Sequence, residues 1–190
     1  MSDHLRLPVF VLGVVIAPGG RLPLRVFEPR YLAMVKWCMR HGEGFIVVTP
    51  DGDGFAQRGC VCRIVDFDQL PDGCLGLTAA GDSLVELTAP AQDEDGLWWA
   101  EQQALPPEAD CEPGEDEADL VNLLVSLSEH PAVQSLDLDI DFESASEVGW
   151  RLIELLPFDV PVKQSLIELH NPLLRLEALR DALSSLQAPT

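Results

Sequence analysis

The residues of this sequence that could cleave a peptide bond are a serine and a lysine two positions apart, Ser165 and Lys163. A lysine activates a serine hydroxyl only when the two side chains face each other. Residues two positions apart point to different sides of a helix, so the spacing favours a solvated helix surface over a catalytic pair. Neither the G-x-S-x-G motif of serine hydrolases nor the GxxxxGK(S/T) loop of ATPases occurs in the sequence. We therefore expect a protein that is not an enzyme.

Three of the five cysteines have a spacing that could hold a metal ion. Cys60 and Cys62 would share one face of a strand, and Cys74 could lie on its hairpin partner. However, the C-x-C spacing differs from the C-x₂-C spacing of zinc sites, and no histidine is near in the sequence. Small buried thiols that pack as apolar side chains explain the pattern better than zinc.

An acidic run offers a second possible metal site. Asp137, Asp139 and Asp141 carry oxygen ligands that suit Ca²⁺, but the glycine and glutamate of an EF-hand loop do not follow in register. A solvated acidic segment is the favoured interpretation. The sequence therefore predicts neither a metal site nor another cofactor.

The charge of the chain restricts its partners. The sequence carries 12 Lys and Arg against 32 Asp and Glu, for a formal net charge of −20, and no Lys or Arg occurs between Arg63 and Arg151. Such an acidic chain repels phosphate groups, so nonspecific binding to nucleic acid or to an anionic membrane is disfavoured. An odd number of cysteines, no apolar run approaching ~20 residues and no secretory signal predict a cytoplasmic protein.

The elements that must position these residues differ between the two halves of the chain. In the first half, a helix is expected to begin at Pro29 and end at Gly42. Its apolar stripe is expected to consist of Leu32, Val35 and Met39, widened by Tyr31, Met34 and Cys38. Alternating and β-prone segments predict strands within 5–27 and at 44–49, 59–68, 74–79, 83–88 and 97–101. The first hundred residues therefore favour a largely antiparallel β unit with one inserted helix.

The second half is expected to be helical. Residues 106–117 are acidic and contain prolines, which indicates a linker. Beyond it, helices are predicted at about 116–129, after the capping box of Ser144 and Glu147, at 161–169, and after Asn171-Pro172. The segment 132–143 fits either a strand or a loop. We therefore expect a β domain at 1–105, an acidic linker at 106–117 and an α-helical domain at 118–190.

One segment points to a known family. Residues 22–31 (LPLRVFEPRY), preceded by Leu7-Pro8, Leu12-Gly13 and Pro18-Gly19, resemble the amino-terminal domain family of Lon proteases. That family includes the equivalent domain of cereblon and small stand-alone bacterial proteins. The resemblance implies an α+β fold, in which a PUA-like antiparallel β pseudo-barrel with one inserted helix precedes a C-terminal helical bundle. It also implies binding of polypeptide, because in Lon the domain helps to recognise and hold unfolded or tagged substrates.

The candidate binding residues are charged and aromatic. The bland interpretation of the segment 28–31 is structural: the glutamate caps the helix or pairs with an arginine, and the tyrosine is partly core. The functional interpretation is a recognition patch, to which one of two adjacent tryptophans on a strand contributes because it faces outward. The residues of this hypothetical peptide-binding site are Arg21, Arg25, Glu28, Arg30, Tyr31, Trp98 and Trp99.

These observations favour a non-catalytic protein that recognises proteins or peptides. Its expected partners are an unfolded or tagged polypeptide and a protease, and its finer expected role is that of an adaptor in protein quality control. A PUA-like RNA-binding module is an alternative by fold analogy, although the acidic charge argues against it. A hydrolase with an unrecognised site is a second alternative.

Overall fold

The computed structural model describes residues 6–187 of the chain. The chain divides into two compact units, Met1–Leu105 and Pro106–Thr190. We call them the β unit and the helical unit and describe each by itself. Strands in the first and helices in the second confirm the expected α+β class.

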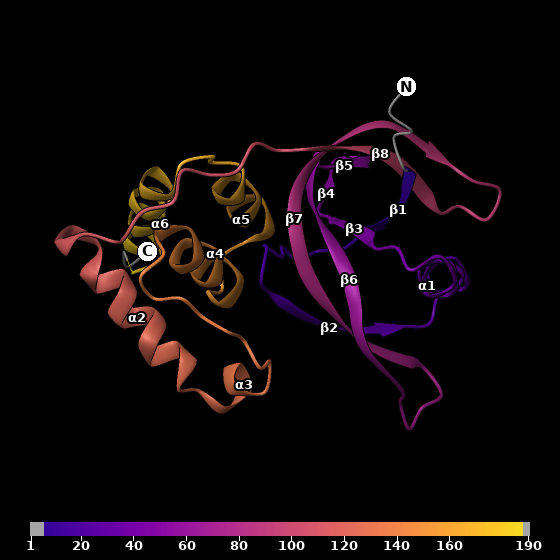
Figure 1. Ribbon diagram of the computed structural model, residues 1–190, viewed down its shortest axis with the longest axis horizontal. Coiled ribbons are helices and arrows are strands. Elements are labelled where there is room, and N and C mark those ends of the chain that lie inside the picture. The colour runs from indigo at the N-terminus through magenta and orange to yellow at the C-terminus, as the bar shows by residue number, and fades with distance from the viewer. Residues whose placement is uncertain (1–5, 188–190) are drawn as a thin grey trace. The chain divides into compact units, whose positions relative to one another are not determined.

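Six strands of the β unit form one sheet in the order β2-β7-β6-β3-β1-β8 among the described residues, and β7 also pairs with β8. This additional pairing closes five strands into a ring, as in a small barrel, and leaves β2 outside on the first part of β7. The short strands β4 and β5 pair separately. The bounds, which can be followed in Figure 1, are β1 (Arg6–Val11), β2 (Arg21–Val26), β3 (Phe45–Val48), β4 (Pro50–Asp51), β5 (Gly54–Phe55), β6 (Arg58–Gln69), β7 (Leu75–Gln92) and β8 (Trp98–Ala104).

One neighbouring pair in this ring is parallel. Val9 of β1 lies beside Ile46 of β3 in a parallel ladder, whereas the other pairs are antiparallel. The expectation of an antiparallel barrel is therefore wrong for β1 and β3. Parallel neighbours need a crossover connection, and here the chain passes through β2 and the helix α1 (Pro29–His41) before it returns as β3.

β7 is a single strand of 18 residues, where the sequence predicts two strands at 74–79 and 83–88. The chain does not turn back at Gly81 because its backbone is bonded to an earlier turn. The N–H of Gly19 donates to the carbonyl of Gly81, and the N–H of Gly81 donates to the carbonyl of Gly20, both at 3.0 Å. A Cβ atom at Gly81 would overlap with the carbonyl oxygen of Ala17, so the close approach requires glycine.

The helix predicted from Pro29 to Gly42 is confirmed as α1. Gly42 adopts a φ of 69°, in the left-handed region that favours glycine, and its N–H donates to the carbonyl of Cys38 at 2.9 Å. The buried stripe is narrower than the predicted one, because Leu32 and Met39 are exposed. The buried side chains of the helix are those of Tyr31, Met34, Val35 and Cys38.

The ring of strands carries apolar side chains on both faces, which explains why all four residues of β3 are buried. One face is the interior of the ring, because all five ring strands contribute to its cluster: Leu7, Val9, Ile46, Val48, Val61, Val85, Leu87 and Ala100. The other face packs against α1 and β2, and its cluster includes Phe10, Val26, Met34, Phe45, Val47, Cys60, Cys62 and Leu77. The β unit therefore positions α1 firmly on the outside of the ring.

The helical unit is organised around α4, which contacts α2, α5 and α6. The hydroxyl oxygen of Ser144 accepts a bond from the N–H of Glu147 at 3.0 Å, and the side-chain oxygen of Asn171 accepts one from the N–H of Leu174 at 3.0 Å, so both N-caps are confirmed. The second bond of the predicted capping box is not formed, because the N–H of Ser144 donates to the carbonyl of Asp141 at 3.4 Å. Within the ambiguous segment 132–143 the chain forms the end of one short helix and no strand. The helices are η1 (Glu115–Glu117), α2 (Ala118–Ser128), α3 (Pro131–Gln134), α4 (Ala145–Leu155), α5 (Val160–Ile167) and α6 (Pro172–Gln187). None of the helices within 6–187 is both long and apolar enough to span a membrane.

Candidate functional site

Exposed apolar side chains gather at one place in the β unit. Five of them, with Phe27 65% exposed and Phe67 54% exposed, lie along α1 and the hairpin of β6 and β7. We call this group the Phe67 seam, because Phe67 lines both of the hollows that the group surrounds. Its members are Phe27, Leu32, Met39, Val65 and Phe67.

Two hollows adjoin Phe67 on the side of α1. The first, of 620 Å³, is lined by Phe27, Leu32 and Phe67 together with residues of the hairpin turn. The second, of 270 Å³, is lined by Met39, Val65 and Phe67. Side chains from helix and hairpin thus meet around a shared aromatic ring, and this arrangement suits the binding of apolar side chains.

The local fold of β6 explains why this apolar surface stays open. β3 pairs with β6 only as far as Cys62, and beyond that point β6 pairs only with β7, whose other edge is paired with β2 as far as Leu75. The β6–β7 hairpin can be followed in Figure 1. A register shift between Ile64 and Asp66 inserts Val65 as an extra residue. Phe67 then lies opposite Leu77. The ring of Phe67 therefore lies on the apolar face of the hairpin, at a position where no further element covers it in the described β unit.

The opposite face of the hairpin carries charge. A third hollow, of 400 Å³, is lined by Arg25, Asp66 and Asp68 together with apolar residues that include Phe67 and Leu77, and we call it the charged hollow. Arg25 forms an ion pair with Asp72 in the turn of the hairpin. The pKa of Asp72 is lowered, first by the backbone N–H of Cys74, which donates to its carboxylate at 2.9 Å, and also by Arg25.

The structure brings some of the predicted binding residues to this region. Arg21 and Arg25 lie on β2, and the Glu28–Arg30 ion pair, 2.8 Å between Oε2 and the guanidinium, follows directly after Phe27. Glu28 precedes the helix without a side-chain cap, so of its two expected structural roles it performs the pairing. Tyr31 is buried, with its ring centroid 4.0 Å from that of Phe10.

The two tryptophans belong to another part of the β unit. Trp98 packs against Phe55, with ring centroids 5.4 Å apart, and Trp99 packs against Trp37 at 5.0 Å. Both are half-buried, whereas one buried and one exposed ring are expected from their adjacency. The indole N–H of Trp99 donates to Asp93 at 2.8 Å and lowers the pKa of that carboxyl. The aromatic partners of the two tryptophans do not line any of the three hollows.

The comparison with known proteins supplies the family. Residues 6–185 match the family model of the ATP-dependent protease La (LON) substrate-binding domain. The chain belongs to this family. A solved Lon N-terminal domain protein from Xanthomonas campestris is 33% identical and has a TM-score of 0.78, covering 93% of this chain and 98% of that chain. The N terminal domain of Mycobacterium avium complex Lon protease shares the fold at 17% identity, with a TM-score of 0.69, covering 93% of this chain and 97% of that chain.

In this member of the LON substrate-binding domain family, sequence analysis missed the seam. Leu32 and Met39 read as core residues because they fit a helical stripe, and Phe27 and Phe67 are 40 positions apart. The available signal is local to β6: Val65 and Phe67 are large apolar residues among aspartates, beyond the end of the β3 pairing. Only the register of β6 and β7 shows that they are exposed.

The groups considered for chemistry do not come together. Cys60 and Cys62 are buried in the core, whereas Cys74 lies beside Arg25 in the hairpin turn, so the three thiols do not form a cluster. The part of the chain covered by the structure holds no group of three potential metal ligands. The hydroxyl of Ser165 donates to the carbonyl of Val162 at 2.8 Å, and the Lys163 ammonium donates to the carbonyl of Glu154 at 3.0 Å. Serine and lysine thus have separate backbone partners.

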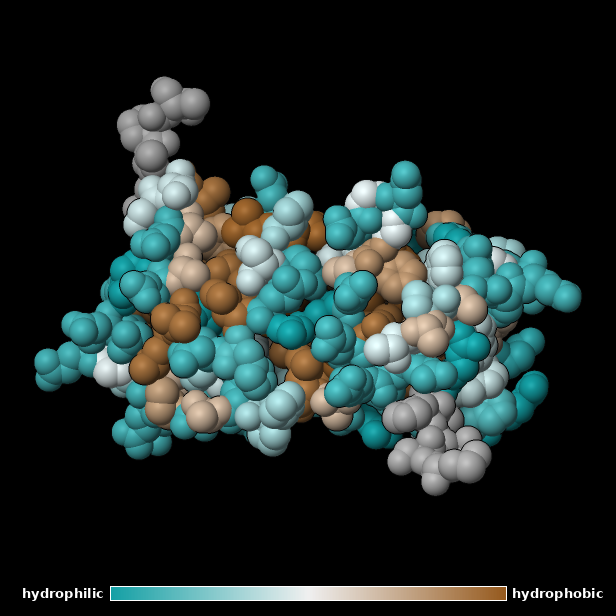
Figure 2. Space-filling model, turned by 90° about the horizontal axis from the view of Figure 1, so that it is seen from above, coloured by the Kyte–Doolittle hydropathy of each residue, from teal (hydrophilic) through white to brown (hydrophobic). Residues whose placement is uncertain are grey.

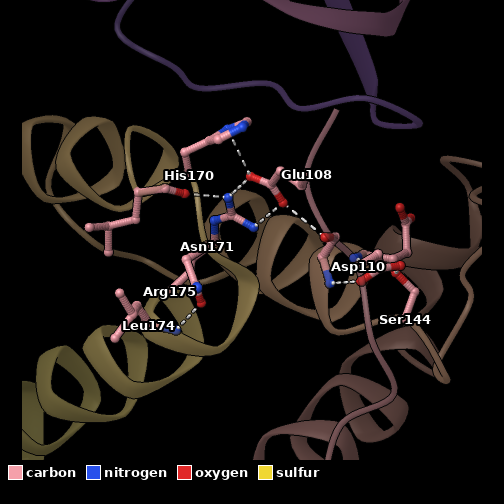
Figure 3. A network of polar contacts seen from close by, with 10 residues as sticks. Glu108, Asp110, Ser144, His170, Asn171, Leu174 and Arg175 are labelled. Atoms are coloured by element: carbon pink, nitrogen blue, oxygen red, sulfur yellow. Dashed lines mark hydrogen bonds and ion pairs between the residues drawn. The ribbon is translucent and has the colours of Figure 1, made fainter. Parts of the chain in front are cut away.

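The helical unit contains a polar network that the sequence did not reveal (Figure 3). The guanidinium of Arg175 forms two bonds with the carboxylate of Glu108, one of them at 3.0 Å. The hydroxyl of Ser146 donates to the same carboxylate at 2.8 Å, and His170 lies 3.9 Å from it. Asp110 accepts bonds from the hydroxyl of Ser144 at 2.6 Å and from the N–H of Ser146 at 2.9 Å.

This network is structural. Both serine hydroxyls donate to carboxylates, so neither is activated by the imidazole of His170 as a nucleophile would be. Its effect is to attach the start of the acidic segment 106–117 to α4 and α6. The segment is therefore more than the solvated linker that its composition indicates.

Proposed function

We propose that this chain holds an unfolded or tagged polypeptide by binding its apolar side chains on the Phe67 seam. The observation that supports this proposal most is the meeting of five exposed apolar side chains at two adjoining hollows. Contiguous exposed apolar surface is typical of interaction sites. The family is that of the LON substrate-binding domain, which agrees with such a role.

The residues expected from the sequence contribute unequally to this proposal. Arg25 lines the charged hollow, and Glu28 and Arg30 lie next to Phe27, so these three form part of the rim. Arg21 lies further along β2. Tyr31 supports α1 from its buried position, and the surface of Trp98 and Trp99 remains a separate candidate for contact with a long polypeptide.

The experiment that tests the proposal compares two variants, in each of which an apolar residue with the same exposed fraction is replaced by serine. Phe67 and Leu174 are both 54% exposed, but Leu174 lies in the helical unit. We expect Phe67→Ser to weaken binding of a permanently unfolded, fluorescently labelled protein by about tenfold, because the central aromatic residue of such a site carries much of the binding energy. Leu174→Ser should change the affinity by less than about twofold.

Figure 2 shows why the control is needed: on the face that it displays, apolar side chains appear in several groups among polar ones. Equal losses of affinity in the two variants would mean that binding depends on exposed apolar surface in general. If both variants kept the full affinity of the unmodified protein, the polypeptide would bind elsewhere. Either result would contradict the assignment to the seam.

The finer part of the proposal is that the chain acts as an adaptor in the cytoplasm and delivers the held polypeptide to a Lon-type protease. Its own contribution is binding, without catalysis. Five free thiols agree with a reducing compartment. We expect the chain to raise the rate at which a purified Lon-type protease degrades the labelled unfolded protein, and Phe67→Ser to abolish this increase. An unchanged rate would contradict the adaptor role and leave the binding result intact.

A further inference from the structure

The outer edge of β6 has no partner strand beyond the point where β3 ends. The ladder between them runs from Phe45 opposite Cys62 to Val47 opposite Cys60. From residue 66 to residue 69, β6 pairs only with β7 in the described β unit, and these residues are exposed together with the bulged Val65. This stretch is therefore an open sheet edge that runs directly along the Phe67 seam.

The direction of the backbone groups on this stretch follows from one hydrogen bond. The N–H of Leu70 donates to the carbonyl of Cys74 at 2.9 Å, so it points across the hairpin. Successive residues of a strand direct their backbone groups to opposite edges. The N–H and carbonyl groups of Gln69 and Phe67 therefore point to the open edge.

Both outward N–H groups are occupied by neighbouring carboxylates. The N–H of Phe67 donates to Asp66 Oδ1 at 2.9 Å, and the N–H of Gln69 donates to Asp68 Oδ1 at 2.7 Å. Charged residues on an edge protect it from unwanted strand pairing. Here the protection is exchangeable, because an incoming carbonyl oxygen could take the place of each carboxylate oxygen.

The charges along the edge are unbalanced. Asp66 and Asp68 form no ion pair with a basic side chain among residues 6–187, and both line the charged hollow. The nearby basic residues already have acidic partners: Arg25 with Asp72, Arg30 with Glu28, and Arg63 with Asp82. The free charge on this edge is thus negative.

We propose that an extended polypeptide segment with alternating apolar and basic residues binds as an added strand on β6, along residues 65–69. Side chains of an added strand alternate between the two faces of the hairpin. Apolar residues would pack against Phe67 on one face, and lysines or arginines would pair with Asp66 and Asp68 on the other. The N–H groups of Phe67 and Gln69 then donate to the carbonyls of the segment. This inference rests on the proposed function and specifies its substrate class.

A second copy of the chain is a poor occupant of the same edge. Two such edges would bring the carboxylates of Asp66 and Asp68 of both copies together, in molecules that each carry a net charge of −20. Like charges opposite each other destabilise a strand pair. Charge complementarity therefore selects a basic partner.

The first test compares three labelled peptides of equal length on the intact chain, by fluorescence anisotropy. The first alternates lysine with valine and a central phenylalanine, the second has the same composition with the lysines in one block, and the third has glutamate in place of lysine. We expect the alternating lysine peptide to bind at least about tenfold more tightly than either of the others. Equal affinities of the alternating and block peptides would overturn the added-strand geometry.

The second test removes one backbone donor. Gln69→Pro deletes an N–H that points to the open edge and leaves the ladder with β7 intact, a position at which strands tolerate proline. We expect Gln69→Pro to lower the affinity for the alternating peptide by about tenfold and Gln69→Ala to have little effect on it. Equal affinities of these two variants would overturn the inference. A loss of peptide affinity in Phe67→Ser in the same assay would still support the proposed function. Failure of the added-strand inference can therefore be distinguished from failure of the proposed function.

The third test concerns charge selectivity. The double variant Asp66→Asn, Asp68→Asn keeps a side-chain oxygen to accept the outward N–H groups but removes both charges. We expect its preference for the lysine peptide over the glutamate peptide to fall to about twofold or less. An unchanged preference would show that other acidic groups of the chain cause the selectivity and would contradict the assignment to β6.

Discussion

Arg175 of α6 and Glu108 of the segment before α2 form a buried ion pair across 67 positions of sequence. The Arg175 side chain is 0% exposed and the Glu108 side chain 7% exposed. Two charges removed from water are tolerated only when they remain paired and hydrogen-bonded. The contact therefore makes the folding of the acidic segment and of α6 dependent on each other.

We expect Glu108→Gln to destabilise the helical unit by about 3–5 kcal/mol, because it leaves the Arg175 charge buried without a counter-charge. Denaturant unfolding followed by far-ultraviolet circular dichroism measures this change. Asp119→Asn is the matched control, since it breaks a pair with Arg180 whose side chains are 61% and 36% exposed. That variant should cost at most about 1 kcal/mol. Similar costs in both variants would show that the buried pair has no special role.

A second prediction concerns the close approach at Gly81. Gly81→Ala should destabilise the β unit by about 1–3 kcal/mol, because its Cβ atom would overlap with the Ala17 carbonyl oxygen and force the backbone apart. Gly13→Ala provides the comparison, since a Cβ atom there meets nothing within 4 Å. We expect the second variant to be neutral or more stable by up to about 1 kcal/mol. Thermal unfolding of the two variants measures this difference. If Gly81→Ala were no less stable than Gly13→Ala, this account of the long strand would be refuted.

A third prediction concerns the reactivity of the thiols. Burial raises the pKa of Cys38 to about 12, so its thiol stays protonated at neutral pH. A thiol reagent should modify the exposed Cys111 first and Cys74 next, and should leave Cys38, Cys60 and Cys62 unmodified until the chain unfolds. Mass spectrometry after limited labelling identifies the order. Rapid modification of Cys38 in the folded chain would contradict its buried position.

The same shift predicts a dependence of stability on pH. The pKa of Cys38 in the folded state is above its value of about 8.5 in the unfolded chain. Between these values the unfolded chain loses the proton and the folded chain keeps it, so stability should fall as the pH rises above about 8.5. Cys38→Ala should reduce this alkaline loss of stability, whereas Cys111→Ala should leave it unchanged. Identical alkaline profiles for all three proteins would rule out Cys38 as the cause.

Local signals in the sequence determined the features that depend on a few neighbouring residues. Pro29 and Gly42 bound α1 because proline suits the first turn of a helix and glycine adopts the left-handed conformation after the last one. Ser144 and Asn171 cap their helices through atoms only three residues away. The family resemblance also depends mainly on one contiguous run, residues 22–31, so it can be recognised without knowledge of the fold.

The tertiary structure alone decided which distant segments meet. Closure of the sheet depends on β7 reaching both β6 and β8, and the parallel pairing of β1 with β3 depends on the path through β2 and α1. The Phe67 seam and the pair of Arg175 with Glu108 join residues tens of positions apart. Such contacts are selected by the packing of the whole unit, and no local propensity encodes them, so neither the open edge of β6 nor the buried charge pair could be predicted from sequence alone.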